Sequence, residues 1–292
     1  MIAVMGASGN VGSKVADLLL ERGEDVRVFG RSAERLEPLG ARGAEIAVGD
    51  AMRVEDLTTL FADADAALVV LPDNAGDPDY AANRSEMSRA ITQALRDRRV
   101  GHVVFASSIG AEKASGVGPV AGLHELEELL FGLEEADVLS LRAAPHMEQN
   151  LLGNIPVIQE QKMNGGVIEG DLRFPMIASI DIAERAAGHL ADRDFDGHMV
   201  ETVLGPEDVT MNEVTLALGA ALGIPDLPYV EFPPEGVVAA LQGAGMSEEF
   251  ASLLVEMQLA LNDGRMTDEA HRTAETTTPT RVEEFLSSAL GR

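Results

Sequence analysis

Cysteine is absent from the 292 residues of this chain, which excludes disulfides, thiolate metal sites and a cysteine nucleophile. Any redox chemistry must therefore come from a bound cofactor. No apolar run reaches the roughly 18 residues that a membrane-spanning helix needs. The chain opens on an apolar, strand-like segment rather than on a basic leader peptide. We therefore expect a soluble, cytoplasmic protein without a membrane partner.

Basic residues are also scarce, because 22 lysines and arginines stand against 49 aspartates and glutamates. The formal net charge of −27 repels nucleic-acid phosphates, which argues against direct nucleic-acid binding. Hydrophobic residues make up 46% of the chain and can fill a large core. Because a chain of this length lies near the size at which one core divides, we expect one large domain with a smaller lobe.

Short apolar runs alternate with helical patterns through the first half of the chain. The runs lie at residues 2–5, 25–29, 44–48, 66–71, 102–106 and 138–142. The helical patterns occupy the stretch between the first two runs and residues 32–40, 53–62, 80–97 and 119–134. This alternation predicts an α/β fold with a doubly wound parallel sheet of the Rossmann type.

The regular alternation breaks after residue 142. A helix is predicted from Asp181, which we interpret as its N-cap, and the chain then returns to the sheet. Further helices are predicted at 211–223, 233–245 and 248–264, with a short strand at 229–232 and a capped final helix. We therefore expect a cofactor-binding domain at 1–153, which the segment near 178–206 rejoins. Residues 154–292 are expected to form a smaller, mostly helical lobe on the substrate side.

A glycine-rich segment follows the first predicted strand and opens the first helix. Its glycines permit a tight turn, and its backbone amides can face an anion at the helix N-terminus. Between a strand and a helix, this pattern predicts a loop that binds the pyrophosphate of a dinucleotide. The candidate cofactor contacts in this loop are Gly6, Ser8, Gly9, Asn10, Val11 and Gly12.

The second predicted strand ends before Arg31, where an NAD-selective protein usually carries a carboxylate. Arg31 and Arg35 offer guanidinium groups to the 2′-phosphate of NADP(H), which we therefore expect in preference to NAD(H). The alternative is that both arginines only solvate the start of a helix. Asp50 is placed either at the adenine end of the cofactor or at the N-cap of the next helix. Leu71 and Pro72 complete the expected cofactor contacts.

Several motifs in order along the chain carry a family resemblance. They are GASGNVG at 6–12, Arg31, Gly49-Asp50, FASSIGA at 105–111, His124 with Glu127, LRAAPHMEQNLL at 141–152 and TPTRVEEFL. With these motifs the chain resembles the NmrA-like family of atypical short-chain dehydrogenases over nearly its whole length. The resemblance implies a Rossmann domain that binds NADP(H) and a small C-terminal lobe that forms a cleft with it. Members of that family include quinone and azo reductases as well as redox sensors without turnover.

The tyrosine and lysine dyad of ordinary short-chain dehydrogenases is missing. In that dyad the lysine lowers the tyrosine pKa so that the phenol can exchange a proton with substrate. Here Arg84 stands four residues after Tyr80, and Pro233 stands four residues after Tyr229. Sugar-nucleotide epimerase and ordinary alcohol dehydrogenase activities are therefore disfavoured, and Tyr80 is interpreted as a packing residue at a helix start.

Polar residues near the expected strand ends are candidates for chemistry. Ser107 is a candidate contact of the nicotinamide carboxamide, and Ser108 is a candidate catalytic residue; the alternative for both is capping of the strand end. His124 is a second candidate catalytic residue, as a proton donor, and an ordinary structural histidine is the alternative. Glu127 lies on the same helix face as His124, where it is either an orienting group or one acid among many.

The substrate cleft is expected to include Pro145, His146 and Asn150, where the chain leaves the sixth strand. No cluster of His, Asp or Glu has metal-ligand spacing, so no metal is expected. The leading hypothesis is an NADPH-dependent, flavin-free reductase of a quinone-like or azo-like acceptor. The alternative is a non-catalytic NADP(H) sensor whose acidic surface binds a basic regulatory protein. A tailoring reductase or isomerase of aromatic natural products is a third hypothesis.

Overall fold

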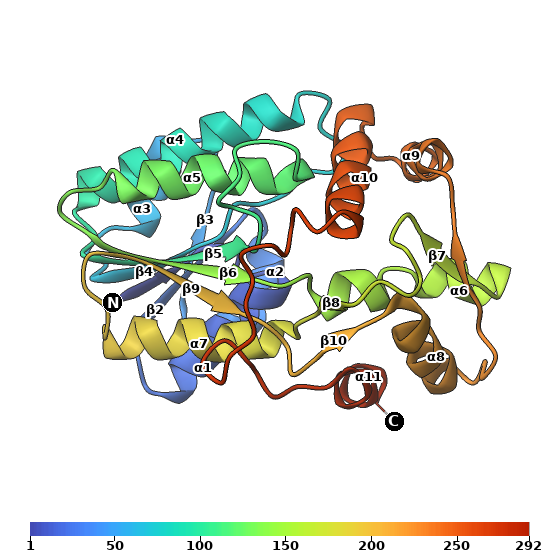
Figure 1. The fold of residues 1–292 in the computed structure, drawn as a ribbon. Helices are drawn as coiled ribbons and strands as arrows, with labels where there is room; N and C mark the ends of the chain where they lie inside the picture. Colours follow the sequence, from blue (N-terminus) through green and yellow to red (C-terminus); the bar gives the residue numbers. More distant parts are fainter. Residues whose placement is uncertain (292) are drawn as a thin grey trace.

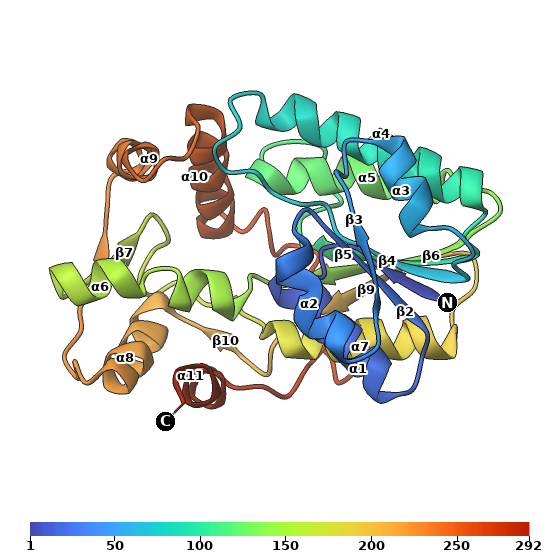
Figure 2. The same cartoon turned by 180° about the vertical axis from the view of Figure 1, so that it is seen from behind.

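A computed structural model describes residues 1–291 of the chain and shows a large parallel sheet with helices on both faces (Figures 1 and 2). The strand order is β3-β2-β1-β4-β5-β6-β9, and every neighbouring pair is parallel. The strands are β1 (Ile2–Val4), β2 (Val26–Gly30), β3 (Glu45–Val48), β4 (Ala66–Val69), β5 (His102–Ser108), β6 (Asp137–Ala143) and β9 (His198–Val203). The predicted doubly wound fold is confirmed.

Apolar side chains on the two faces of this sheet form two separate cores. On β5, Val104 faces one core and Phe105 faces the other, because neighbouring side chains of a strand point to opposite faces. The first core is covered by α1 (Asn10–Glu21), α2 (Ala33–Ala41) and α7 (Ser179–Asp192). The second is covered by α3 (Val54–Leu60), α4 (Tyr80–Arg98) and α5 (Ala121–Phe131), which the 3-10 turn η1 (Gly118–Val120) precedes.

The start of α7 corrects one local prediction. The helix begins at Ser179 with Ala178 as its N-cap, so Asp181 lies in the first turn and is not the N-cap. The Asp181 carboxylate instead accepts hydrogen bonds from the backbone N–H (3.1 Å) and the hydroxyl (2.6 Å) of Thr280. This carboxylate therefore ties the C-terminal segment to the sheet layer.

The remaining elements gather beside the carboxyl ends of the large sheet (Figures 1 and 2). The helices are η2 (Glu148–Leu152), α6 (Ile155–Gln161), α8 (Met211–Leu222), α9 (Pro234–Gly243), α10 (Glu248–Asn262) and α11 (Val282–Leu290). The strands β7 (Asn164–Gly166) and β11 (Tyr229–Glu231) pair in parallel, whereas β8 (Phe174–Pro175) and β10 (Asp208–Val209) pair antiparallel. Within residues 1–291 no helix is long and apolar enough to cross a membrane.

Candidate cofactor and acceptor site

The glycine loop lies between β1 and α1, at the carboxyl edge of the sheet. Gly6 adopts a left-handed φ of +64°, and its carbonyl accepts a hydrogen bond of 2.8 Å from the Gly9 N–H. Gly9 is the N-cap of α1, and no side chain caps this helix. Because the first amides of a helix have no intrahelical partner, the exposed turn at Ser8, Gly9 and Asn10 can bind an anion.

The backbone packing of this loop requires glycine at a second position. A Cβ atom at Gly12 would collide with the Gly6 carbonyl, whose carbon would lie 2.6 Å away, and would lie 2.8 Å from the Met5 carbonyl oxygen. Only a residue without a side chain lets α1 approach β1 this closely. Val11, which directly precedes Gly12, is buried in the core between α1 and the sheet. These features fit the pyrophosphate of a dinucleotide, which needs close backbone approach at a helix N-terminus.

Two arginines without an acidic partner among residues 1–291 lie at the same edge of the sheet as the glycine loop. Arg31 directly follows β2, and Arg35 lies in the first turn of α2, whose N-cap Ser32 accepts the Arg35 backbone N–H. Both side chains are exposed, and neither guanidinium has a hydrogen bond or ion pair with any residue between 1 and 291. In a chain with a net charge of −27, guanidinium groups without an acidic partner are available to bind an anion.

The other expected cofactor contacts follow β3 and β4. Asp50 is exposed and does not cap α3, because the N-cap of that helix is Arg53. The Asp50 carboxylate instead accepts the Met52 N–H (3.0 Å) within its own turn. Leu71 is buried and Pro72 is half-buried just beyond β4, the strand that neighbours β1.

Ser107 and Ser108 end β5, and their hydrogen bonds differ. Ser107 is buried under α5, where its hydroxyl donates to Glu127 Oε1 at 2.6 Å. Ser108 is half-buried, and its hydroxyl donates to the Ile109 carbonyl at 2.9 Å. Both hydroxyl hydrogens are therefore engaged within the protein, and each oxygen has lone pairs left to accept a hydrogen bond.

An ionic network that runs from the buried Glu127 toward the surface beside these serines was missed from the sequence. Arg142, on β6, binds Glu127 through Nη2 (2.7 Å) and Glu112 through Nη1 (3.2 Å). Lys113 binds Glu112 (2.8 Å) and Asp268 (2.7 Å), which follows α10. An arginine within a predicted strand of the sheet was the signal, because a charge that the fold covers requires a partner.

His124 lies on the half-buried face of α5. Its Nδ1 is 2.9 Å from the Ala111 carbonyl oxygen, which can only accept, so Nδ1 carries the hydrogen. The ring is thus oriented by this carbonyl, and Glu127 is engaged with Arg142 instead. His124 lines a pocket of about 580 Å³ between α4, α5 and α10, which Arg84 and Leu253 also line. In the neutral ring, Nε2 is an acceptor.

The segment after β6 lies next to the start of α1. Burial lowers the pKa of the His146 side chain, Glu148 opposes this shift, and Lys14 adds to it. Because its ordinary pKa is about 6.5, His146 is neutral at pH 7. The Asn150 side-chain amide donates to the His146 carbonyl (2.8 Å) and orders the turn, while Pro145 is half-buried beside it.

Tyr80 is a packing residue, as its position suggested. It begins α4, is 2% exposed and packs against Phe250 of α10 with ring centroids 4.6 Å apart. Its hydroxyl donates to Asp73 and accepts from Arg84 (2.7 Å), which also pairs with Asp73. Burial raises the pKa of the Tyr80 phenol, so this group stays protonated and fixes the loop after β4.

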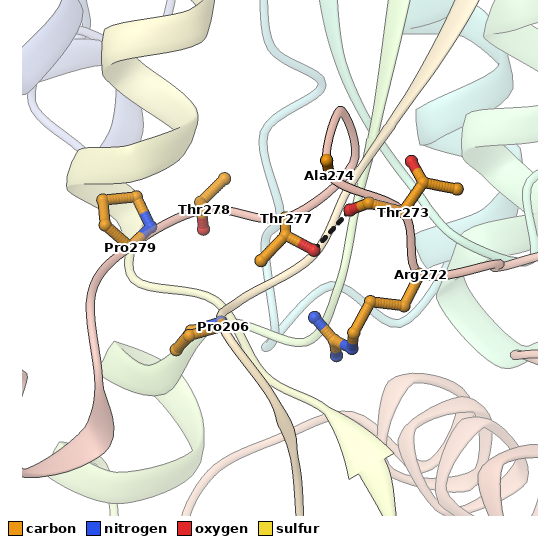
Figure 3. A pocket seen from close by; sticks show the side chains of 7 residues that line it. All are labelled: Pro206, Arg272, Thr273, Ala274, Thr277, Thr278 and Pro279. Carbon is orange, nitrogen blue, oxygen red and sulfur yellow. Dashed lines mark hydrogen bonds between the residues drawn. The ribbon is translucent and has the colours of Figure 1, made fainter.

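A separate hollow of about 640 Å³ lies where the C-terminal segment crosses Pro206 (Figure 3). The Thr277 hydroxyl donates to the Thr273 carbonyl (2.6 Å), and Arg272 reaches the Gly205 carbonyl. None of the predicted site residues lines this hollow, so it belongs to the packing of the tail. Across the described part of the chain, no three His, Asp or Glu side chains are grouped to hold a metal ion.

The loop, the free arginines and the strand order define a Rossmann-type dinucleotide-binding protein. Residues 6–139 match the model of a family described as NAD(P)H-binding. The resemblance expected from the motifs is confirmed at the level of the fold. A crystal structure of a mutant NmrA has a TM-score of 0.66 at 16% identity, covering 98% of this chain and 90% of that chain.

Three reductases are similar to the chain over most of its length. An NAD(P)H azoreductase of Xenophilus azovorans is 28% identical over 264 residues, which cover 88% of this chain and 86% of the azoreductase. The NADPH-dependent quinone oxidoreductase of Escherichia coli, complexed with NADPH, has a TM-score of 0.82 at 20% identity, covering 99% of both chains. The Citrobacter sp. triphenylmethane reductase, complexed with NADP(H), has a TM-score of 0.83 at 20% identity, covering 99% of this chain and 100% of that chain.

Proposed function

We propose that the protein is a flavin-free NADPH-dependent reductase of quinone-like or azo-like acceptors. The glycine loop carries this proposal, because Gly6 makes the tight turn, Gly9 begins α1 without a capping side chain and Gly12 lets α1 pack closely on β1, as in a dinucleotide-binding loop. The similarity to an azoreductase and to quinone and triphenylmethane reductases supports the same class of acceptor. These acceptors share a flat conjugated system that takes up hydride.

Gly6, Gly9 and the first turn of α1 would hold the pyrophosphate, and Arg31 with Arg35 would hold the 2′-phosphate. The exposed, unpartnered state of both guanidinium groups supports a preference for NADPH over NADH. When bound, NADPH supplies a hydride. The protein then has to orient the acceptor and exclude competing reactions, which is the usual division of work in cofactor enzymes.

The acceptor would lie between the carboxyl ends of β4 to β6 and the lobe formed by residues 154–292. Orientation against the cofactor supplies most of the acceleration, because a quinone or azo group accepts hydride readily. His124 would supply a proton to the acceptor through Nε2, since its Nδ1 is bound to the Ala111 carbonyl. His146 is held neutral and would line the cleft beside Asn150.

The test is to follow NADPH consumption by the purified protein with quinones, azo dyes and triphenylmethane dyes as acceptors. Because the chain has no tryptophan, NADPH binding can be measured by cofactor fluorescence in the same sample. We expect turnover that Gly9→Asp abolishes, since a carboxylate at the N-cap of α1 would repel the pyrophosphate. Tight NADPH binding without turnover on any acceptor would instead support the sensor hypothesis.

A further inference from the structure

The most densely hydrogen-bonded carboxylate beside the site belongs to Glu127, which is 2% exposed. Its Oε1 accepts from Ser107 (2.6 Å) and Ser140 (2.5 Å), and its Oε2 accepts from Arg142 Nη2 (2.7 Å). Arg142 Nε also donates to Oε1 at 3.2 Å. Both oxygens of this side chain therefore act as acceptors, toward two hydroxyl groups and one guanidinium.

Glu127 fixes the direction of the hydrogen bonds of Ser107. A hydroxyl has one hydrogen and two lone pairs, and the hydrogen of Ser107 is given to Glu127. The Ser107 oxygen can therefore only accept a hydrogen bond from anything at the carboxyl end of β5. A group that offers only a lone pair, such as a carbonyl oxygen, finds no donor in the Ser107 hydroxyl.

The nicotinamide end of the cofactor is the group expected at this position. In a doubly wound sheet the dinucleotide crosses the switch point, and the second half of the sheet holds the second mononucleotide. Here the switch point lies between β1 and β4, and β5 is the next strand. If the adenine end of the cofactor lies beside Arg31, the nicotinamide mononucleotide is expected at the carboxyl ends of β4 and β5.

Building on the proposed function, we propose that Glu127, held by Arg142, is a positioning residue that makes Ser107 an obligate acceptor for the carboxamide N–H of the nicotinamide. The surrounding network supports this role. Glu112 and Lys113 extend the ion pair, and Lys113 also binds Asp268 at the exposed side of the network. Arg142 is thereby held between Glu112 and Glu127, which keeps its guanidinium against Glu127.

The experiment compares two cofactors that differ in the group attached to the pyridine ring. NADP⁺ carries a carboxamide, which donates and accepts, whereas the acetylpyridine analogue of NADP⁺ carries a methyl ketone, which only accepts. The measured quantity is the ratio of their dissociation constants from calorimetry, without turnover. For the unmodified protein we expect NADP⁺ to bind about fivefold more tightly, the usual size of one neutral hydrogen bond.

Ser107→Ala removes the acceptor, so the ratio is expected to fall to about one. In Glu127→Gln, the new side-chain amide oxygen accepts the hydrogen bond of Arg142, and the amide NH₂ then faces Ser107. The Ser107 hydrogen is thereby released toward the cleft and serves either ring substituent, so the ratio again falls to about one. The matched control is Ser140→Ala, because Ser140 donates to the same Oε1 but lies deeper in β6 and is 0% exposed.

We expect Ser140→Ala to keep the fivefold ratio of the unmodified protein. The inference is overturned if the unmodified protein shows no preference, if Ser107→Ala retains it, or if Ser140→Ala loses it equally. Should Glu127→Gln fail to fold, the comparison of Ser107→Ala with Ser140→Ala still tests whether Ser107 is the acceptor. The proposed function fails differently, because a protein that binds neither cofactor, or consumes no NADPH with any acceptor, refutes the reductase itself.

Discussion

Arg31→Ala should weaken NADPH binding and leave NADH binding unchanged. The Arg31 guanidinium is exposed and unpartnered among residues 1–291, so its removal breaks no ion pair in the free protein. A hydrogen bond to a charged group is worth about 1.5 to 3 kcal/mol, and exposure places this one at the lower end. We therefore expect NADPH affinity to fall about tenfold, whereas NADH, which lacks the 2′-phosphate, should change less than about twofold.

Long-range electrostatics must be separated from direct contact in this measurement. Each cofactor is anionic and the protein already carries a net charge of −27, so losing any arginine increases repulsion. Arg98→Ala is the matched control, because Arg98 is also exposed and unpartnered within the described chain but lies at the far end of α4. Fluorescence titration of all three proteins with both cofactors gives the dissociation constants. Equal losses for NADPH and NADH in Arg31→Ala, or an equal loss in Arg98→Ala, would refute the 2′-phosphate assignment.

Three further changes test the structure. Gly12→Ala should lower both the melting temperature and the affinity for either cofactor, because its Cβ meets loop backbone; unchanged values would contradict the packing. Arg142→Met should lower the unfolding free energy by about 3 to 5 kcal/mol in denaturant titrations, since Glu127 loses its buried cation. The pKa of His189 is raised mainly by its hydrogen bond to Glu201, so its contribution to the stability of the folded protein should be complete below pH 6.5. That contribution should shrink as the pH rises through the raised pKa. His189→Gln should remove this part of the pH dependence of melting.

The parts of the site that were predictable depend on short-range patterns. The glycine spacing at 6–12 lies directly between an apolar run and an amphipathic helix, so the strand, turn and helix could be read together. The runs that became β1 and β4 are buried throughout, which gives them an unmistakable apolar pattern. β9 is a contrast, because it is an edge strand with an exposed start and carries a weaker signal.

The ionic network could not be predicted, because its partners are distant in the sequence. Glu127 and Arg142 are 15 residues apart, on a helix and a strand that meet only after folding. Asp181 was assigned to a helix N-cap for a related reason. Local preference suggested a cap, whereas its actual partner is Thr280, 99 residues further along the chain.

The central claim is that this chain passes hydride from NADPH directly to a quinone-like or azo-like acceptor. The most direct test uses purified protein without added flavin, under anaerobic conditions, with NADPH deuterated at the transferred position. We expect acceptor reduction to proceed, deuterium to leave the cofactor, and the transfer rate in a single turnover to fall relative to ordinary NADPH. Reduction that requires added flavin, or NADPH that stays bound and unconsumed with every acceptor, would contradict the account.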